Sequence, residues 1–561
     1  MKKDDLIFVT IEDLSNEGLG IGHSGGTAFF VKDTVIGDTA EAKVMKMKKT
    51  YGYARLVRLL SPSQDRVTPS CPVARQCGGC QLQAMSYEAQ LKFKENKVKN
   101  ALARIGGFEN PPMEPIVGMD YPFRYRNKAQ YPVGRNKDGR ITAGFYAGRT
   151  HDIIENRDCL LGPEINKDIL DIILSHMETY DIAPYDEKSC SGLVRHIMIR
   201  QGFKTGQIMV CLVLNGTSMP VSEALVKELQ KIKGMTSVSI SVNRENTNVI
   251  LGRKIKLLWG REYIEDKIGE LVFRISPLSF YQVNPNQTEK LYGKALEYAG
   301  LTGRETVWDL YCGTGTISLF LAQQAGKVFG VEIVPDAIRD AKENAARNHI
   351  SNAEFYVGKA EEVLPQKYEE EDVTADVIVV DPPRKGCDPS VLSTIARIRP
   401  QRIVYVSCDP ATLARDLKYL CGEGYRLERA CPVDMFGMSG HVETVVLLSK
   451  LNAKQHIEVE LNLDELDLTA AESKATYDEI KAYVLEKYGL KVSSLYISQV
   501  KRKCGLEVGQ NYNLLLGSGE INHSGSGENR QFWSNENHQS GVASPQVVLF
   551  TRPAAGQPVS Q

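Results

Sequence analysis

Two short sequence motifs contain the residue types with the most distinctive chemistry. In V-S-C-D-P at 406–410, Cys408 follows an apolar run and stands where a strand would end. In H-V-E-T at 441–444, Glu443 opens a second apolar run that reaches Leu448. A thiol can act as a nucleophile and a carboxylate as a base. The pair could therefore add to an electron-poor ring, remove a proton from it and release it again.

A glycine-rich turn lies upstream of both words, in D-L-Y-C-G-T-G-T at 309–316. Gly313 and Gly315 would let a strand turn tightly into a helix and leave room for a ligand. The spacing lacks the third glycine of a dinucleotide-binding loop and the Lys-Ser/Thr of a phosphate loop. Glu332 ends the next strand-like run, where a carboxylate could accept both hydroxyls of a ribose. With Asp381-Pro-Pro further on, the pattern resembles that of an S-adenosylmethionine-dependent methyltransferase.

These groups suit methyl transfer to carbon 5 of uracil. That carbon is a poor nucleophile until a thiolate adds to carbon 6 and converts the ring to an enolate. The carbon-5 proton must then be removed before the thiol can leave, so the reaction needs one Cys and one base. We assign these roles to Cys408 and Glu443. A helix beginning near Thr412 is expected to lower the pKa of the Cys408 thiol.

Composition is that of an ordinary globular protein with more than one domain. The chain has 561 residues, of which 42% are hydrophobic and 24% charged, and its formal net charge is −1. Nucleic-acid binding would therefore rely on local patches of positive charge. Because no apolar run is long enough to span a membrane and the start lacks a signal-peptide core, we expect a cytoplasmic protein. Clustered Cys residues are then expected to be metal ligands or catalysts.

Apolar periodicity divides the chain into five segments. Residues 1–60 predict a small closed β-barrel of the oligonucleotide-binding kind, and residues 61–271 predict a central α+β domain. Residues 272–450 alternate strands and helices, which indicates an α/β fold with a doubly wound, mostly parallel sheet. We expect a small helical module of unknown role over 455–515 and a disordered tail over 516–561. The strand-like runs of the α/β segment are Thr306–Leu310, Lys327–Glu332, Ala353–Val357, Val377–Asp381, Ile403–Ser407 and Val442–Leu448.

Two basic and aromatic stretches could contact RNA. The stretch from Lys43 to Arg58 has six cations and no acid, with Tyr51 and Tyr53 interleaved. Cations for phosphates and rings for bases suit single-stranded RNA, although a solvated edge strand rich in Lys would look the same. A second run, Y-P-F-R-Y-R-N-K at 121–128, is another candidate RNA surface.

A tight thiol loop, C-P-V-A-R-Q-C-G-G-C, spans residues 71–80. Gly78 and Gly79 would let the backbone wrap closely around a metal, and a fourth ligand from elsewhere is required. From spacing alone, zinc held by four thiolates is the simplest interpretation.

The chain resembles the RNA (uracil-5-)-methyltransferase family, and closely its branch that acts on 23S ribosomal RNA. The matching words, in family order, are S-F-Y-Q-V-N at 279–284, D-L-Y-C-G-T-G-T at 309–316, G-V-E at 330–332, V-D-P-P-R-K-G at 380–386, V-S-C-D-P at 406–410 and H-V-E-T at 441–444. They cover the chain from the N-terminal barrel to about residue 450. The resemblance implies a Rossmann-like catalytic domain that uses S-adenosylmethionine, and an N-terminal TRAM domain.

The resemblance also implies roles for individual residues. Cys408 is implied to be the nucleophile and Glu443 the base. Phe280 is implied to border the target base, and the flipped uridine should enter between the catalytic and central domains. The expected cofactor-binding residues, including the glycine turn, are Gln282, Tyr311, Gly313, Glu332 and Asp381. For the thiol loop, the resemblance implies a structural 4Fe-4S cluster rather than zinc, held by Cys71, Cys77, Cys80 and Cys159.

We therefore expect a monomeric enzyme, not bound to a membrane, that methylates carbon 5 of a specific uridine in 23S ribosomal RNA. Two alternatives stay open. A transfer-RNA uridine-5 methyltransferase would use the same chemistry, but such enzymes are shorter and as a group lack the barrel and the Cys loop. The chain could also be a non-catalytic iron–sulfur RNA-binding protein with a vestigial methylase fold, which intact Cys408, Glu443 and Glu332 argue against.

Overall fold

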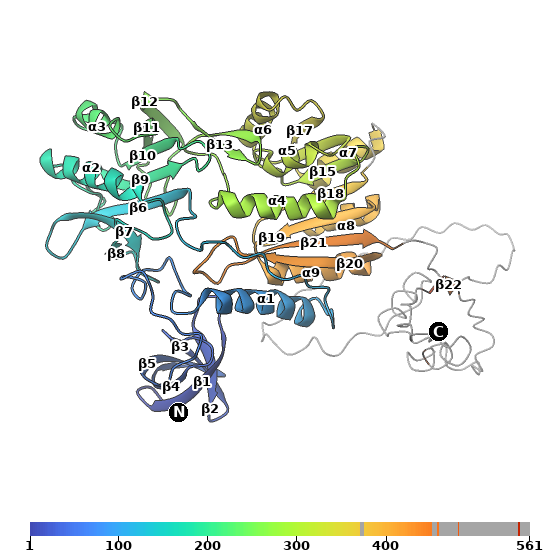
Figure 1. Cartoon of the computed structure of the whole chain (residues 1–561), viewed down its shortest axis with the longest axis horizontal. Coiled ribbons are helices and arrows are strands. Elements are labelled where there is room, and N and C mark those ends of the chain that lie inside the picture. The colour runs from blue at the N-terminus through green and yellow to red at the C-terminus, as the bar shows by residue number, and fades with distance from the viewer. Residues whose placement is uncertain (371–374, 452–456, 459–480, 482–547, 550–561) are drawn as a thin grey trace, which may run out of the picture. The chain divides into compact units, whose positions relative to one another are not determined.

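Residues 1–450 form one compact unit of the chain, and residues 451–561 form a second (Figure 1). This computed structural model describes residues 1–370, 375–451, 457–458, 481 and 548–549. In the second unit, the short strand β22 (Ile457–Glu458) pairs antiparallel with β23 (Val548–Leu549). Apart from residue 481, the rest of the predicted helical module and of the predicted tail lies outside the described residues.

A closed five-stranded barrel forms the N-terminus, as the sequence predicts, with the strand order β1-β2-β3-β5-β4. Its strands are β1 (Leu6–Leu14), β2 (Gly20–Ser24), β3 (Thr27–Lys32), β4 (Thr39–Met47) and β5 (Tyr51–Ser61). Alternate residues of β1 point inward, so that Ile7, Val9 and Ile11 pack with Phe29 and Val31 of β3. The edge-strand interpretation of the basic stretch is wrong, because β5 pairs with β3 and with β4.

The barrel gathers three aromatic rings on β3 and β5. Phe30 is opposite Tyr53 in the parallel pairing of these strands, and Tyr51 lies nearby. The ring centroids are 5.4 Å apart for Phe30 and Tyr51 and 5.6 Å apart for Tyr51 and Tyr53. None of the three side chains is fully buried. The cluster therefore offers ring surface beside the basic stretch, where bases could stack.

The central domain contains a seven-stranded sheet with the order β12-β11-β10-β9-β6-β7-β8. All its strand pairs are antiparallel except β10 with β11. The elements are β6 (Lys128–Arg135), β7 (Ile141–Tyr146), β8 (Ile153–Glu155), α2 (Ile165–Thr179), β9 (Val194–Gln201), β10 (Ile208–Leu214), α3 (Ser222–Leu229), β11 (Met235–Val242) and β12 (Lys254–Gly260). A hairpin of β13 (Ile264–Ile268) and β14 (Leu271–Ile275) precedes the last sheet.

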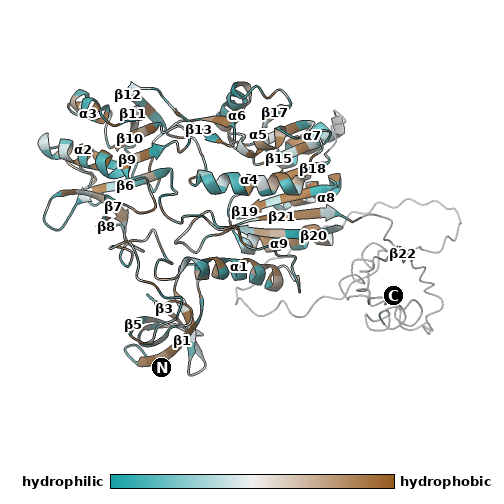
Figure 2. Ribbon diagram, viewed as in Figure 1, coloured by the Kyte–Doolittle hydropathy of each residue, from teal (hydrophilic) through white to brown (hydrophobic). Residues whose placement is uncertain are grey.

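The last sheet is doubly wound, with the order β17-β16-β15-β18-β19-β21-β20. Its strands are β15 (Thr306–Leu310), β16 (Lys327–Glu332), β17 (Ala353–Val357), β18 (Val377–Val380), β19 (Arg402–Ser407), β20 (Tyr425–Val433) and β21 (Glu443–Lys450). The first five in this order are parallel, and β21 runs antiparallel to both its neighbours. The strands are largely hydrophobic, as Figure 2 shows, because both faces of the sheet are covered.

Helices cover both faces of this sheet and enclose two separate hydrophobic clusters (Figure 1). One face is covered by α4 (Pro285–Ala299), α5 (Thr316–Ala322) and α6 (Pro335–Arg347). The other is covered by α1 (Tyr87–Arg104), α7 (Ala360–Glu370), α8 (Pro389–Ile398) and α9 (Pro410–Gly422). None of the helices in the described part of the chain is long and apolar enough to cross a membrane.

Helix α1 lies in the range predicted for the central domain, yet it contacts the last sheet. Lys94 of α1 is fully buried, and its Nζ donates to Asp434 Oδ1 at 2.6 Å and to the Phe436 carbonyl at 2.9 Å. The hydroxyl of Tyr87 donates to the other Asp434 oxygen at 2.8 Å. Helix α1 therefore fixes the loop that leads into β21.

Removing the Lys94 ammonium would leave a buried carboxylate without its ionic partner. We expect Lys94→Ala to lower the free energy of unfolding by about 3–5 kcal/mol. The matched control is Lys99→Ala on the exposed side of α1, which should change it by less than about 0.5 kcal/mol. Denaturant unfolding of both variants measures this, and equal losses would contradict the importance of the buried pair.

Candidate active site

A cavity of about 1410 Å³ opens at the carboxyl ends of the parallel strands of the last sheet. It brings together every catalytic and cofactor-binding residue that the sequence predicts. These lining residues are Gln282, Tyr311, Gly313, Glu332, Asp381, Cys408 and Glu443. Phe280, expected beside the target base, also lines it and is 73% exposed. Ligands of doubly wound sheets bind at this edge.

The glycine-rich turn joins β15 to α5 and forms the floor of this cavity. Three of its residues have positive φ: Tyr311 at 77°, Gly313 at 54° and Gly315 at 80°. Glu332, at the end of β16, accepts hydrogen bonds from the backbone N–H of Gly313 at 3.3 Å and of Val334 at 3.0 Å. Its carboxylate is thereby held at the edge of the cavity beside the turn, where a ribose could bind.

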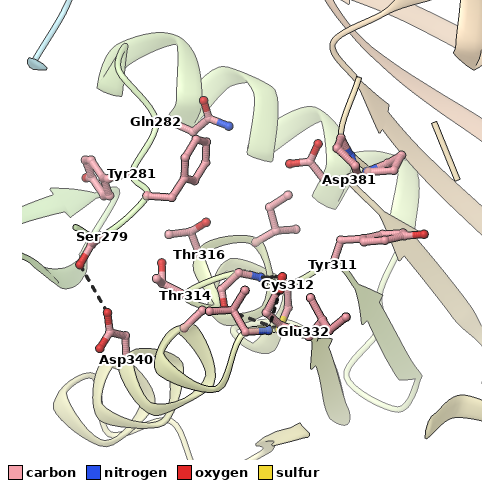
Figure 3. A pocket seen from close by; sticks show the side chains of 18 of the residues that line it. Ser279, Tyr281, Gln282, Tyr311, Cys312, Thr314, Thr316, Glu332, Asp340 and Asp381 are labelled. Atoms are coloured by element: carbon pink, nitrogen blue, oxygen red, sulfur yellow. Dashed lines mark hydrogen bonds between the residues drawn. The ribbon is translucent and has the colours of Figure 1, made fainter. Parts of the chain in front are cut away.

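Asp381 and Gln282 lie across the open space from Thr314 and Glu332 (Figure 3). Asp381 follows β18 directly. Burial, and then the nearby charge of Asp309, raise the pKa of Asp381 to about 7. The backbone carbonyl of Gln282 accepts a hydrogen bond from the side chain of Asn127 at 2.9 Å, which ties this loop to the central domain.

Strand register places Cys408 beside Glu443. Strands β19 and β21 are antiparallel, and Ser407 is opposite Thr444. Cys408, the first residue after β19, therefore lies beside Glu443 at the start of β21. Asp409 follows and caps α9, where it accepts from the first free N–H groups of the helix at 2.9 and 3.1 Å.

The expectation of a lowered Cys408 pKa is wrong. Burial, and then the charges of Glu443 and Asp381, raise the pKa of Cys408 to about 11, against an opposing effect of Arg384. The α9 N-terminus does not offset this, because Asp409 occupies its free N–H groups. Burial also raises the pKa of Glu443 to about 8, with Asp381 acting in the same direction.

Arg384, His441 and Arg126 are among the cavity residues that were not predicted as site residues. Arg384 lies in the V-D-P-P-R-K-G word and opposes the upward pKa shifts of Cys408 and Glu443. His441 lies in the H-V-E-T word, and Arg126 lies in the basic run at 121–128. The sequence motifs that contain these residues could have indicated them, but a motif does not show which of its side chains face the cavity.

The four predicted thiol ligands line a second cavity, of about 310 Å³. Burial raises the pKa of Cys80 to about 12 and raises the pKa of Cys159 as well. Arg126 and Lys128 line the same cavity, and neither forms an ion pair with a described residue. Four thiols beside two such cations fit an anionic thiolate centre. Among the described residues, no three side chains converge closely enough to hold a single metal ion.

Comparisons with known proteins agree with this geometry. Residues 205–451 match the family model of tRNA (uracil-5-)-methyltransferase, and residues 7–57 match that of the TRAM domain. A protein of Halalkalibacterium halodurans, named as an uncharacterized RNA methyltransferase, is 49% identical over 453 residues, which are 81% of this chain and 98% of the relative. A Clostridium tetani protein with the same description is 46% identical, with 81% and 98% covered.

A solved structure is similar along most of the chain. The tRNA (uracil-54, C5)-methyltransferase of Pyrococcus abyssi, in complex with S-adenosyl-L-homocysteine, is 29% identical, with a TM-score of 0.63. The similarity covers 78% of this chain and 99% of that one. Together with the family models and the relatives above, it shows that the chain belongs to the S-adenosylmethionine-dependent RNA (uracil-5-)-methyltransferase family and carries an N-terminal TRAM domain.

Proposed function

We propose that this protein methylates carbon 5 of a specific uridine in 23S ribosomal RNA through a covalent adduct with Cys408. The observation that carries the proposal is that Cys408 and Glu443 line the same cavity, each directly beside the paired residues Ser407 and Thr444 of β19 and β21. The same cavity contains Glu332 and Asp381. A non-catalytic RNA-binding protein would have no need of this arrangement.

The residues divide the reaction between them. S-adenosylmethionine supplies the methyl group to carbon 5. The Cys408 thiolate adds to carbon 6 of the uracil and makes carbon 5 nucleophilic. Glu443, in its ionised form, takes the proton from the methylated carbon 5, and the ring electrons then expel Cys408 as thiolate. Arg384 favours the ionised form of both groups, and Glu332 and Gln282 orient the cofactor.

The 23S substrate is supported by the match of the sequence words to that branch of the family. Transfer RNA is the second candidate, and the Pyrococcus enzyme favours it. That tRNA enzyme is similar to 78% of this chain, so the argument that tRNA enzymes are too short does not apply to it. Methylation of a 23S transcript and of transfer RNA in parallel, each with labelled S-adenosylmethionine, tests the choice. Label on the 23S transcript alone supports the proposal, and label on transfer RNA alone refutes the ribosomal substrate.

The raised pKa of Glu443 predicts how activity depends on pH. A base must be ionised to act, so kcat/KM should rise steeply up to about pH 8, and less steeply from there toward about 11, where the Cys408 thiol ionises. The fold should respond in the opposite sense. The pKa of Glu443 is about 8 in the folded protein and 4.5, its ordinary value, in the unfolded chain. Between these two pH values the folded protein holds a proton that the unfolded chain has lost. The contribution of this carboxyl to stability therefore falls as pH rises from 4.5 to about 8. Glu443→Gln should therefore gain thermal stability over the wild type at pH 9 but not at pH 5.

We further propose that Cys71, Cys77, Cys80 and Cys159 hold a 4Fe-4S cluster. The support is that four thiols and two cations line one cavity, together with the family resemblance. The cluster would pin the thiol loop against the segment at 124–127 that borders the active site. Methyl transfer needs no electron, so its role would be structural.

Metal analysis tests the cluster directly. Anaerobically purified protein is expected to contain about four irons and four sulfides per chain, and Cys159→Ser is expected to lose most of both. Cys190→Ser, at an exposed thiol outside the cavity, serves as the control and should retain them. One zinc per chain without iron would contradict the cluster and favour the zinc interpretation.

A further inference from the structure

Arg200 is a buried cation with no anionic partner among the described residues. It lies near the end of β9 in the central sheet and is 1% exposed. Its guanidinium donates to two backbone carbonyls, those of Ser276 at 3.3 Å and Ser279 at 3.1 Å. Burying a charge that only carbonyls compensate is costly. Burial lowers the pKa of Arg200 only to about 10, so it stays protonated at neutral pH.

Both carbonyls belong to the active-site loop, which we define as residues 276–284 between β14 and α4. Leu278, Phe280 and Gln282 of this loop line the catalytic cavity. The loop has neither helix nor strand structure, so its carbonyls need donors from elsewhere.

Side chains of the loop itself shape its first turn. The Ser276 N–H donates to Ser279 Oγ at 3.0 Å, and the Ser279 N–H donates to Ser276 Oγ at 3.2 Å. The Ser279 hydroxyl reaches Asp340 of α6 at 3.4 Å (Figure 3). These bonds fix the turn's shape, while Arg200 ties it to the central sheet.

The far end of the active-site loop is also held from the central domain. The backbone N–H of Asn127 donates to the Val283 carbonyl at 2.8 Å, and its side chain donates to the Gln282 carbonyl at 2.9 Å. Phe280 lies between the two anchored ends. The position of the loop over the cavity is therefore set from the central domain, at two points.

We propose that Arg200 is a positioning residue for methyl transfer, which holds the active-site loop so that Phe280 and Gln282 face the reacting groups. Arg200 touches neither substrate nor cofactor and acts through the loop. The inference rests on the proposed function for its effect on turnover, but its effect on cofactor binding does not depend on which RNA is methylated. A misplacement of about 1 Å at a reacting centre can cost on the order of 10²-fold in rate.

Arg195 provides a matched control on the same strand. It is 6% exposed, and its guanidinium donates to the carbonyls of Asn243 at 3.1 Å and Glu245 at 2.7 Å. Neither Arg195 nor these two partners lines the catalytic cavity. Arg195→Met therefore removes the same kind of buried contact without freeing the active-site loop.

The experiment compares Arg200→Met with Arg195→Met in the full chain. Melting temperature, the Kd for S-adenosylhomocysteine by calorimetry, and kcat and KM on the RNA that the wild type methylates are measured. We expect similar drops in melting temperature. Only Arg200→Met should weaken S-adenosylhomocysteine binding, by about tenfold, and lower kcat by on the order of 10- to 100-fold. Arg200→Lys, which keeps the charge and can reach one carbonyl, should recover part of both.

Equal effects of the two Met variants on Kd and kcat would overturn the positioning role. If Arg200→Met does not fold, Arg200→Lys is compared with Arg195→Lys instead. A smaller difference in the same direction is then expected, and equal effects would again overturn the positioning role. If the wild type binds S-adenosylhomocysteine but methylates no RNA, the proposed function fails. The comparison of Kd values then still decides whether Arg200 positions the loop.

Discussion

Replacing Cys408 by Ala is expected to abolish methyl transfer while leaving cofactor binding intact. Without a thiolate to add at carbon 6, carbon 5 of uracil stays too poor a nucleophile to accept a methyl group. The expected fall in kcat is at least on the order of 10⁴-fold. The cofactor should still bind, because the glycine-rich turn and Glu332 are unaffected. Single-turnover transfer from labelled S-adenosylmethionine and calorimetric Kd values measure the two properties separately.

Cys421→Ala is the matched control for this variant. Cys421 is half-buried in α9 and does not line the catalytic cavity, so its loss tests whether removing any thiol from this region impairs the enzyme. It should retain turnover within about twofold of the wild type. Sustained methylation by Cys408→Ala would exclude the covalent mechanism.

Changing Glu443 to Gln is expected to trap the protein on its RNA. The amide preserves the size of the side chain but cannot take the carbon-5 proton, so Cys408 cannot be expelled after the methyl group has been transferred. The covalent complex should survive denaturation and appear as a slow band in a denaturing gel. Release of product should fall by about 10³-fold, within the range of general-base contributions.

Two further lanes make this result specific. The double variant Cys408→Ala, Glu443→Gln should give no band, because the bond to RNA is formed by the thiol. Without S-adenosylmethionine no methylated adduct should form. Mass spectrometry of the excised band measures this. Rapid, complete turnover by Glu443→Gln would assign the base to another residue.

The α/β fold was predictable from the sequence to a considerable depth. Six of the seven strands of the last sheet correspond to the apolar runs predicted from the sequence of residues 272–450. Strands that are covered on both faces are almost continuously hydrophobic, which makes them recognisable. The exception is β20, which Arg426, Glu428 and Arg429 interrupt with charge. The positions of these three residues in the strand are partly exposed, so the run no longer reads as a buried strand. The barrel was also predictable, from short runs punctuated by glycines.

The contents of the catalytic cavity were predictable, but the electrostatics were not. Sequence words place Cys408 and Glu443 at the ends of neighbouring strands, and the structure brings them together. The pKa of Cys408 depends on Asp381 and Arg384, which both follow β18, and on Glu443, the first residue of β21, so these charges come together only in the folded sheet. A local argument from the α9 N-terminus therefore gave the wrong direction.

Long-range contacts between domains were beyond sequence patterns altogether. Lys94 looks like any surface lysine of an amphipathic helix, yet its partner Asp434 comes from a loop far along the chain. Arg200 is the last residue but one of β9, and nothing in its sequence neighbourhood indicates burial, yet it is buried against the active-site loop. In both cases the side chain type is common, and only the tertiary structure gives it a partner.

Simultaneous counting of methyl transfer and hydrogen loss at carbon 5 tests the central claim most directly. RNA transcribed with uridine tritiated at carbon 5, both 23S and transfer RNA, would be incubated with the wild type and carbon-labelled S-adenosylmethionine. The mechanism predicts one tritium released to water for each methyl group transferred, because Glu443 must remove that hydrogen. Methyl transfer without tritium release would place the methyl group on another atom and contradict the account.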